Sequence, residues 1–183
     1  MSKLLFAENF AKEKHSGMIR KDGVTPFHEH LAGVVSRLKN LGVTDEDVLA
    51  AAWLHDTIED TSTSFDDIEQ RFGSKVAVLV LALSKDRSLP KARQEEQYVK
   101  QLREASLEAK LVKLCDISAN LKDIKKAPLS KTKKVKTVKK IRHYLDTIKP
   151  ELVKNKSHLS GITNLVDGIN EIIKQFGQKP VVI

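Results

Sequence analysis

The sequence contains little of what exported and membrane proteins need. Its 183 residues include a single cysteine, Cys115, so no disulfide can form within the chain. No run approaches the roughly 18 consecutive apolar residues of a membrane span. The first eight residues have neither the long apolar segment nor the cleavage site of a signal peptide. We therefore expect a cytoplasmic protein in a reducing compartment, with Cys115 acting as a small buried hydrophobe rather than as a nucleophile.

Aromatic residues are also scarce, at 5% of the chain, so the core must be built on aliphatic side chains. A length of 183 residues suits one domain that is large enough to bury a sizeable core. Helical spacing of apolar residues dominates, and no convincing alternation typical of a strand is present. The expected fold class is all-α: a single helical bundle over residues 1–183, with a C-terminal packing helix at about 157–177.

Capping and helix-breaking residues predict where the helices begin and end. Thr44 with Asp47 predicts the start of one helix, and Ser64 with Asp67 predicts the start of a short one. Pro150 predicts a break in the chain. The apolar run 76–83 predicts a central helix. The remaining expected helices cover about 4–15, 31–41, 93–103, 107–121 and 159–176, and the polar segments 20–26 and 84–90 are expected to be loops.

The chain is basic, with a formal net charge of +8 and a pI near 9.5, which favours partners that carry phosphate groups. Much of the excess lies in the lysine-rich segment 125–140. A nucleic-acid interface is one interpretation of this segment. However, Val138, Ile141 and Leu145 are spaced for one buried helical stripe, and no aromatic residues alternate with the lysines. We therefore favour a helix with a solvated lysine face, and a small nucleotide rather than nucleic acid as the partner.

The most informative segment is 55–60, His-Asp-Thr-Ile-Glu-Asp, which follows the apolar run 48–54. On one continuous helix, side chains three and four residues apart share a face, so this polar cluster would project from a single turn. Charged groups beside an apolar run are costly unless they are paired or bind a metal. We therefore predict a metal site that uses His55 and Asp56.

Two ligands leave most of a coordination sphere open, so other side chains must complete it. His30 and Asp116 are the candidates, although each has a simpler interpretation: a hydrogen-bonded histidine at a helix start, and a buried carboxylate paired with Lys113. Mixed imidazole and carboxylate ligands suit Mn²⁺, Fe²⁺ or Zn²⁺. Such an ion polarises a phosphoryl oxygen and lowers the pKa of its bound water. Glu59 is placed to accept the proton of that water, and Asp60 is a second acid–base group, orients Glu59 or faces solvent.

The order His30, then His55-Asp56, then Asp116 resembles the signature of the HD phosphohydrolase superfamily. Three further segments narrow the resemblance to the hydrolase domain of the RelA/SpoT family. They are Arg20-Lys21-Asp22-Gly23, the extended motif 55–61, and Lys113-Leu114-Cys115-Asp116 with Asn120. The similarity covers about residues 7–145 and includes no synthetase region, so the chain resembles the stand-alone small alarmone hydrolases of the Mesh1-like kind.

The resemblance implies an activity and a set of roles. The activity is Mn²⁺-dependent removal of pyrophosphate from the 3′ position of guanosine tetra- and pentaphosphate. The metal ligands would be His30, His55, Asp56 and Asp116, and Glu59 and Asp60 would handle the attacking water. The substrate would be bound by Arg20, Lys21 and Asn120, with Lys85 and Arg87 in the loop beside its phosphates. The chain departs from the family pattern at Glu29, Leu31, Ile117 and Ala119, none of which is a metal ligand in that pattern.

Two other functions remain as alternatives. The same metal chemistry would serve another nucleotide, for example the 2′-phosphate of NADPH, since both substrates carry a ribose phosphate next to a purine. Alternatively, the chain would be a binding module for nucleotides or nucleic acid that has lost catalysis. A module of that kind has no physical need for the complete set of six polar residues at the site, which argues against it. The sequence pattern leaves the oligomeric state open.

Overall fold

The computed structural model describes residues 2–183. Within that range the chain forms helices α1 to α10 and a short 3₁₀ helix, η1, and its only strand-like pairing is an isolated bridge between Ile19 and Pro26. The predicted all-α fold class is therefore confirmed. The helices are α1 (Lys3–Lys14), α2 (Phe27–Asn40), α3 (Glu46–Leu54), α4 (Thr57–Asp60), α5 (Phe65–Phe72), α6 (Ser74–Leu83), α7 (Lys91–Glu104), α8 (Leu107–Lys126), α9 (Lys131–Lys154), η1 (Lys156–His158) and α10 (Ile162–Gln175).

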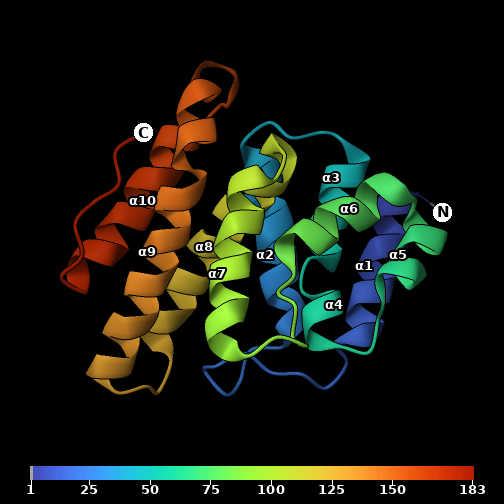
Figure 1. Cartoon of the computed structure of the whole chain (residues 1–183), viewed down its shortest axis with the longest axis horizontal. Coiled ribbons are helices and arrows are strands. Elements are labelled where there is room, and N and C mark those ends of the chain that lie inside the picture. Colours follow the sequence, from blue (N-terminus) through green and yellow to red (C-terminus); the bar gives the residue numbers. More distant parts are fainter. Residues whose placement is uncertain (1) are drawn as a thin grey trace.

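Helices α2 and α8 lie between two groups of helices (Figure 1). On one side, α3 packs against α2 and is followed by α1 and α6, with α5 against α6. On the other side, α9 and α10 pack against α8, and α7 packs on α9. One continuous hydrophobic core, mostly aliphatic, draws buried side chains from both groups. Central helices that are packed on several sides can hold polar side chains away from water, and α2 and α8 carry His30 and Asp116.

Several helix starts follow from local capping, although one predicted cap is wrong. Ser64 and Asp67 form the predicted capping box of α5. For α3, the capping residue is Asp45 rather than Thr44, because the Asp45 carboxylate accepts hydrogen bonds from the backbone amides of Asp47 and Val48. A carboxylate at this position also interacts favourably with the positive end of the helix dipole.

Pro150 does not break the chain as predicted, because α9 continues through it to Lys154. A proline inside a helix costs about 3 kcal/mol, since it removes one backbone hydrogen bond. Here Ile148 and Leu152, on either side of Pro150, are both fully buried in the core. Pro150 itself is exposed. Core packing of the flanking residues therefore outweighs the local penalty.

Helix α6 is less central than its apolar sequence predicted. Its inner face is buried, but Val78 is 57% exposed and Leu81 is 46% exposed. Helix α6 packs against α3, α4, α5, α7 and α8, but part of its apolar surface stays exposed. None of the helices in residues 2–183 is both long enough and apolar enough to cross a bilayer.

Candidate active site

Two histidines and two aspartates from three separate segments of the chain meet inside the bundle. Nε2 of His30 lies 3.2 Å from Oδ1 of Asp116 and 3.6 Å from Oδ2 of Asp56. Nε2 of His55 lies 3.2 Å from Oδ2 of Asp56 and 3.6 Å from Oδ1 of Asp116. Both rings and the Asp116 side chain are almost fully buried. The structure thus brings together all four residues that the sequence suggested as ligands.

The arrangement fits a metal ion. Within residues 2–183, Nε2 of His30 and Nε2 of His55 are buried atoms that make no hydrogen bond, although carboxylate oxygens lie nearby. Leaving such atoms unsatisfied is costly. His55 uses its other ring nitrogen, Nδ1, to contact the backbone oxygen of Ala52 at 2.7 Å. In neutral His55 this contact places the proton on Nδ1 and leaves the Nε2 lone pair free to bind a cation.

The polar cluster 55–60 does not lie on one helical turn, which corrects the prediction made from its spacing. Helix α3 ends at Leu54, and α4 begins at Thr57. His55 and Asp56 therefore occupy the junction between two helices, while Glu59 and Asp60 lie on the four-residue helix α4. The end of α3 leaves the Ala52 carbonyl without a backbone partner, and the His55 ring binds it instead. The junction thus fixes the orientation of the ring.

Asp116 is held from both sides by residues of its own helix. Lys113, one turn earlier, donates to Oδ2 at 2.9 Å, and Asn120, one turn later, donates to Oδ1 at 2.6 Å. The simpler interpretation of Asp116 as a partner of Lys113 is therefore correct as well, because the two carboxylate oxygens have different neighbours. Lys113 takes one oxygen, and the other faces the two histidines.

The buried charges shift one another's pKa values. Burial alone lowers the pKa of His55, but the carboxylates of Asp56 and Asp116 raise it to about 10. Burial raises the pKa of Asp116, but Lys113 and the two histidines hold it well below its usual range. Burial likewise raises the pKa of Asp56, and the His55 charge holds it below its usual range. Two ionised carboxylates beside two histidines suit a divalent cation, which would take the place of the His55 proton on binding.

The candidate catalytic carboxylates contact the loop between α6 and α7. The backbone amide of Lys85 donates to Oε2 of Glu59 at 3.0 Å, and the Lys85 ammonium lies 3.9 Å from the same carboxylate. Arg87 pairs with Asp60 at 2.7 Å. Burial and the negative charges of Asp56 and Glu59 raise the pKa of Asp60, while Arg87 opposes them. This loop therefore contacts both carboxylates and places positive charge beside each of them.

Arg20 and Asn120, both predicted to bind substrate, contact each other. Nη2 of Arg20 donates to Oδ1 of Asn120 at 2.7 Å, and Nε of Arg20 donates to Asp123 at 2.8 Å. The Arg20 guanidinium also lies over the ring of Phe27 at 5.2 Å. Through Asn120 this network reaches Asp116, so the loop that carries Arg20 is connected to the candidate metal ligands.

These residues line one cavity of about 1000 Å³. His55, Asp56, Asp116, Glu59, Asp60, Arg20, Lys21, Lys85 and Asn120 are all at its wall, and among the predicted site residues His30 and Arg87 are not. Sequence reasoning missed several further lining residues. They are Tyr98, Asp123 and Tyr144, Lys91 at the start of α7, and Lys133, Lys136 and Lys140 on α9.

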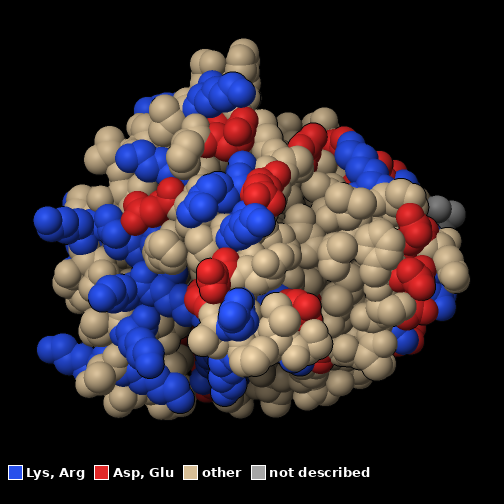
Figure 2. Space-filling model, in the orientation of Figure 1, with Lys and Arg blue, Asp and Glu red and all other residues tan. Residues whose placement is uncertain are grey.

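Helix α9, which contains most of the lysine-rich segment, therefore also forms part of the cavity wall. Its buried stripe is confirmed by Val138, Ile141 and Leu145. The flank next to that stripe faces the cavity, so the interpretation as a purely solvated lysine face is incomplete. Figure 2 shows Lys and Arg side chains concentrated at the lower left of the molecule, the region where α9 begins in Figure 1.

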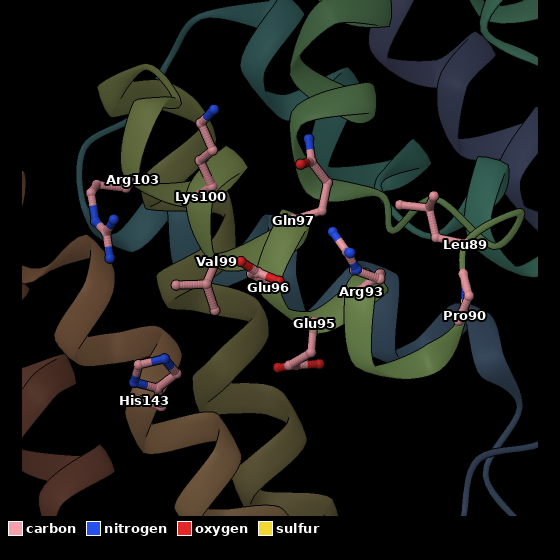
Figure 3. A pocket seen from close by; sticks show the side chains of 10 residues that line it. All are labelled: Leu89, Pro90, Arg93, Glu95, Glu96, Gln97, Val99, Lys100, Arg103 and His143. Atoms are coloured by element: carbon pink, nitrogen blue, oxygen red, sulfur yellow. The ribbon is translucent and has the colours of Figure 1, made fainter.

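A second cavity, of about 940 Å³, lies on the outer side of α7. Its side chains come from α7 and the residues just before it, with His143 projecting from α9 (Figure 3). The lining mixes basic Arg93, Lys100 and Arg103 with acidic Glu95 and Glu96. None of the predicted site residues lines it, so the first cavity is the candidate active site.

Comparisons with known proteins agree with this geometry. Residues 7–143 match the HD domain family. The chain is 46% identical over 123 residues to the guanosine-3′,5′-bis(diphosphate) 3′-pyrophosphohydrolase MESH1 of Danio rerio, covering 66% of this chain and 68% of that protein. It is 44% identical over 125 residues to MESH1 of Homo sapiens, covering 67% and 70%.

A solved structure described as a metazoan ortholog of SpoT that hydrolyzes ppGpp superposes with a TM-score of 0.83 at 30% identity, covering 97% of both chains. The structural match covers 97% of the chain and so extends beyond residues 7–143, which the family model matches. The chain therefore belongs to the HD-domain family and, within it, to the group of the MESH1 proteins.

Proposed function

We propose that this chain hydrolyses the 3′-pyrophosphate of guanosine tetra- and pentaphosphate, releasing pyrophosphate and GDP or GTP. One observation carries the proposal: a single cavity is lined by His55, Asp56 and Asp116 of the His/Asp cluster, by two candidate acid–base carboxylates and by many Lys and Arg side chains. Two relatives that carry this activity in their names, the MESH1 proteins of Danio rerio and Homo sapiens, are 46% and 44% identical to the chain. The single hydrophobic core supports a further proposal, that residues 1–183 act as one HD-type domain.

His30, His55, Asp56 and Asp116 would hold a divalent first-row ion, and we propose Mn²⁺ because imidazole and carboxylate ligands suit it. When bound, such an ion polarises a phosphoryl oxygen and lowers the pKa of a nearby water. Lys113 and Asn120 keep the Asp116 carboxylate in a fixed orientation. Residues that hold a ligand in place are commonly as important to metal affinity as the ligand itself.

Glu59 accepts the proton of the attacking water. The water oxygen forms a bond to the phosphorus attached to the ribose 3′ oxygen, the bond between that phosphorus and the 3′ oxygen breaks, and the 3′ oxygen takes up a proton. Asp60 serves as the second acid–base group, and burial together with the charges of Asp56 and Glu59 raises its pKa, which favours the protonated form more than in a free carboxyl group. Lys85 and Arg87 provide positive charge where the phosphoryl oxygens gain negative charge.

Arg20, Lys21 and Asn120 bind the nucleoside part of the substrate. Arg20 is already held by Asn120 and Asp123, so little side-chain freedom is lost when a ligand binds. Lys21 lies at the same wall of the cavity. A planar guanidinium that is fixed over Phe27 is suited to stack on a purine base.

The test is product release from guanosine tetraphosphate and, in parallel, from NADPH, each with Mn²⁺ and with chelator. Pyrophosphate and GDP that are released only with metal are the expected result. Orthophosphate from NADPH alone would keep the metal site but overturn the substrate. Turnover of neither compound would favour another nucleotide or a non-catalytic binding module.

A further inference from the structure

Three lysines of α9 form a stripe along one wall of the active-site cavity. Lys133, Lys136 and Lys140 are spaced by three and four residues, so they share one face of the helix, and all three line the cavity. Other lysines of the same helix, including Lys131, Lys134 and Lys139, do not line it. The stripe is therefore a feature of the cavity wall and is separate from the general basic character of the helix.

Few carboxylates neutralise the lysines of the stripe. Within residues 2–183, Lys133 and Lys136 make no ion pair, and Lys140 pairs with Glu95 of α7. Like charges at helical spacing repel one another, so three adjacent ammonium groups lower the stability of the helix slightly. An anion bound between them removes that repulsion. The stripe thus has the charge and spacing of an anion subsite.

Lys140 is held in position by its surroundings. Glu95 accepts a hydrogen bond from the Tyr144 hydroxyl and pairs with the Lys140 ammonium. Burial raises the pKa of Glu95, but Lys140 and Tyr144 hold it below its usual value, so the carboxylate is ionised at neutral pH. Glu95 lies between the two cavities: it lines the outer one (Figure 3), while its two partners line the active-site cavity.

The chemistry at the His/Asp cluster does not require this stripe. Lys85 and Arg87 already lie beside the candidate catalytic carboxylates, and Arg20 and Lys21 are available to the base. A cavity of about 1000 Å³ is large for a single cleaved group and has room for a nucleotide with phosphates at two positions. The lysines at the wall that remain without a role are Lys91, at the start of α7, and the three lysines of α9.

We propose that Lys133, Lys136 and Lys140 form a second phosphate subsite, which binds the 5′-diphosphate of the substrate, remote from the bond that is cut. This proposal rests on the proposed function. It adds that the cavity prefers, among substrates, a nucleoside phosphorylated at both the 3′ and 5′ positions. Binding energy from this remote group favours the doubly phosphorylated substrate over one that carries only the 3′-diphosphate.

The test compares two triple variants of the full-length protein. In one, Lys133, Lys136 and Lys140 are replaced by Gln. In the matched control, Lys131, Lys134 and Lys139 are replaced by Gln, which removes the same charge from the same helix. Two quantities are measured: kcat/KM for guanosine tetraphosphate and for guanosine 3′-diphosphate with a free 5′-hydroxyl, and the calorimetric Kd of GDP.

The expected result is selective. The stripe variant loses about tenfold or more in kcat/KM for guanosine tetraphosphate and in affinity for GDP, a change of the size expected when hydrogen bonds to charged groups are removed. Its kcat/KM for the 3′-diphosphate stays within about twofold of the wild-type value, and so do all values of the control. Equal losses in both triple variants would indicate general electrostatic attraction and would overturn the subsite, as would unchanged GDP affinity in the stripe variant.

The GDP measurement separates this inference from the proposed function. If the wild-type protein hydrolyses neither guanosine compound, the proposed function fails. The subsite is still tested in that case, because GDP binding does not depend on turnover. Stripe-dependent GDP binding without hydrolysis would then assign the cavity to a 5′-diphosphate ligand.

Discussion

Asn120 donates a 2.6 Å hydrogen bond to Oδ1 of Asp116, the same carboxylate oxygen that lies 3.2 Å from Nε2 of His30. The carbonyl oxygen of the same amide accepts a hydrogen bond from Arg20. One side chain therefore connects the predicted nucleotide contact with the predicted metal ligands. Asparagine provides a donor and an acceptor at fixed positions, and neither alanine nor aspartate reproduces both.

Replacing Asn120 with Ala is expected to weaken metal and nucleotide binding together. Loss of a residue that orients a ligand typically reduces metal affinity about tenfold or more. The Mn²⁺ dissociation constant of the purified protein, measured by calorimetry, should rise by about that factor, and the KM for the nucleotide should rise as well. Asn164→Ala, on the exposed surface of α10, is the control. Metal affinity equal to that of the wild type would show that Asn120 does not orient Asp116.

Replacing Glu59 with Gln should remove catalysis while leaving the metal bound. The amide still accepts a hydrogen bond from the Lys85 backbone but cannot take the proton of a water. A general base typically contributes about 10²- to 10⁴-fold, so turnover should fall by about 100-fold or more. Mn²⁺ affinity, measured separately, should stay near the wild-type value. Turnover that survives this change would remove Glu59 from the mechanism.

Replacing Lys113 with Met should destabilise the fold. The Asp116 side chain is 5% exposed, and it loses its cationic partner while its charge stays buried. Breaking a buried ion pair from one side costs about 3–5 kcal/mol. In urea denaturation of the metal-free protein, the free energy of unfolding should fall by that amount, seen as a lower midpoint with an unchanged slope. Lys100→Met, on the exposed side of α7, should change stability by about 0.5 kcal/mol or less.

The loop that carries Arg20 should loosen in acid. Hydrogen bonds from the Thr25 hydroxyl and from the backbone amides of Thr25 and Val24 lower the pKa of Asp22 to about 2. Because the folded-state pKa is depressed, the stabilisation is complete above the unfolded pKa of about 3.9 and is lost as the pH falls through about 2. The Thr25 amide resonance, followed by NMR, should titrate in that window. In Asp22→Asn the transition should disappear, and the KM for the nucleotide should rise several-fold at neutral pH.

The thiol of Cys115 should not react with alkylating reagents in the native protein. Its side chain is buried, and burial raises the pKa of its thiol to about 12. The thiolate is the reactive form, so labelling with iodoacetamide at pH 8 should be negligible until urea unfolds the chain. Cys115→Ala should retain activity. Rapid labelling of the folded protein would contradict burial of the thiol.

The sequence predicts much of this site because its signals are local. Ser64 and Asp67 are three residues apart and cap α5 as expected. The residue types of His30, His55, Asp56 and Asp116 indicated that the four side chains bind one metal ion, and they lie together in the structure. The break between α3 and α4 was not predicted, because the spacing of the apolar run 48–54 and of the polar residues 55–60 also fits one continuous helix.

The direction of the α9 lysines could not be predicted either. Spacing identifies the face that contains Val138 and Ile141 as buried, but which flank borders a cavity depends on where α7 and α8 lie. Glu95 shows the same limit, because its partners Lys140 and Tyr144 lie more than 40 positions away in the sequence. Contacts of this kind depend on tertiary packing, and helical periodicity carries no information about them.

The junction between α3 and α4 has a consequence for folding. His30 belongs to α2, His55 and Asp56 to the junction, and Asp116 to α8, so the four side chains converge only after three distant segments have docked. An ion held there acts as a cross-link in a chain whose single cysteine cannot provide one. By mass action, a cation at about 100 times its dissociation constant adds about 2.7 kcal/mol to the free energy of unfolding. Thermal stability should therefore follow cation concentration, and chelation should lower the melting temperature before any substrate is added.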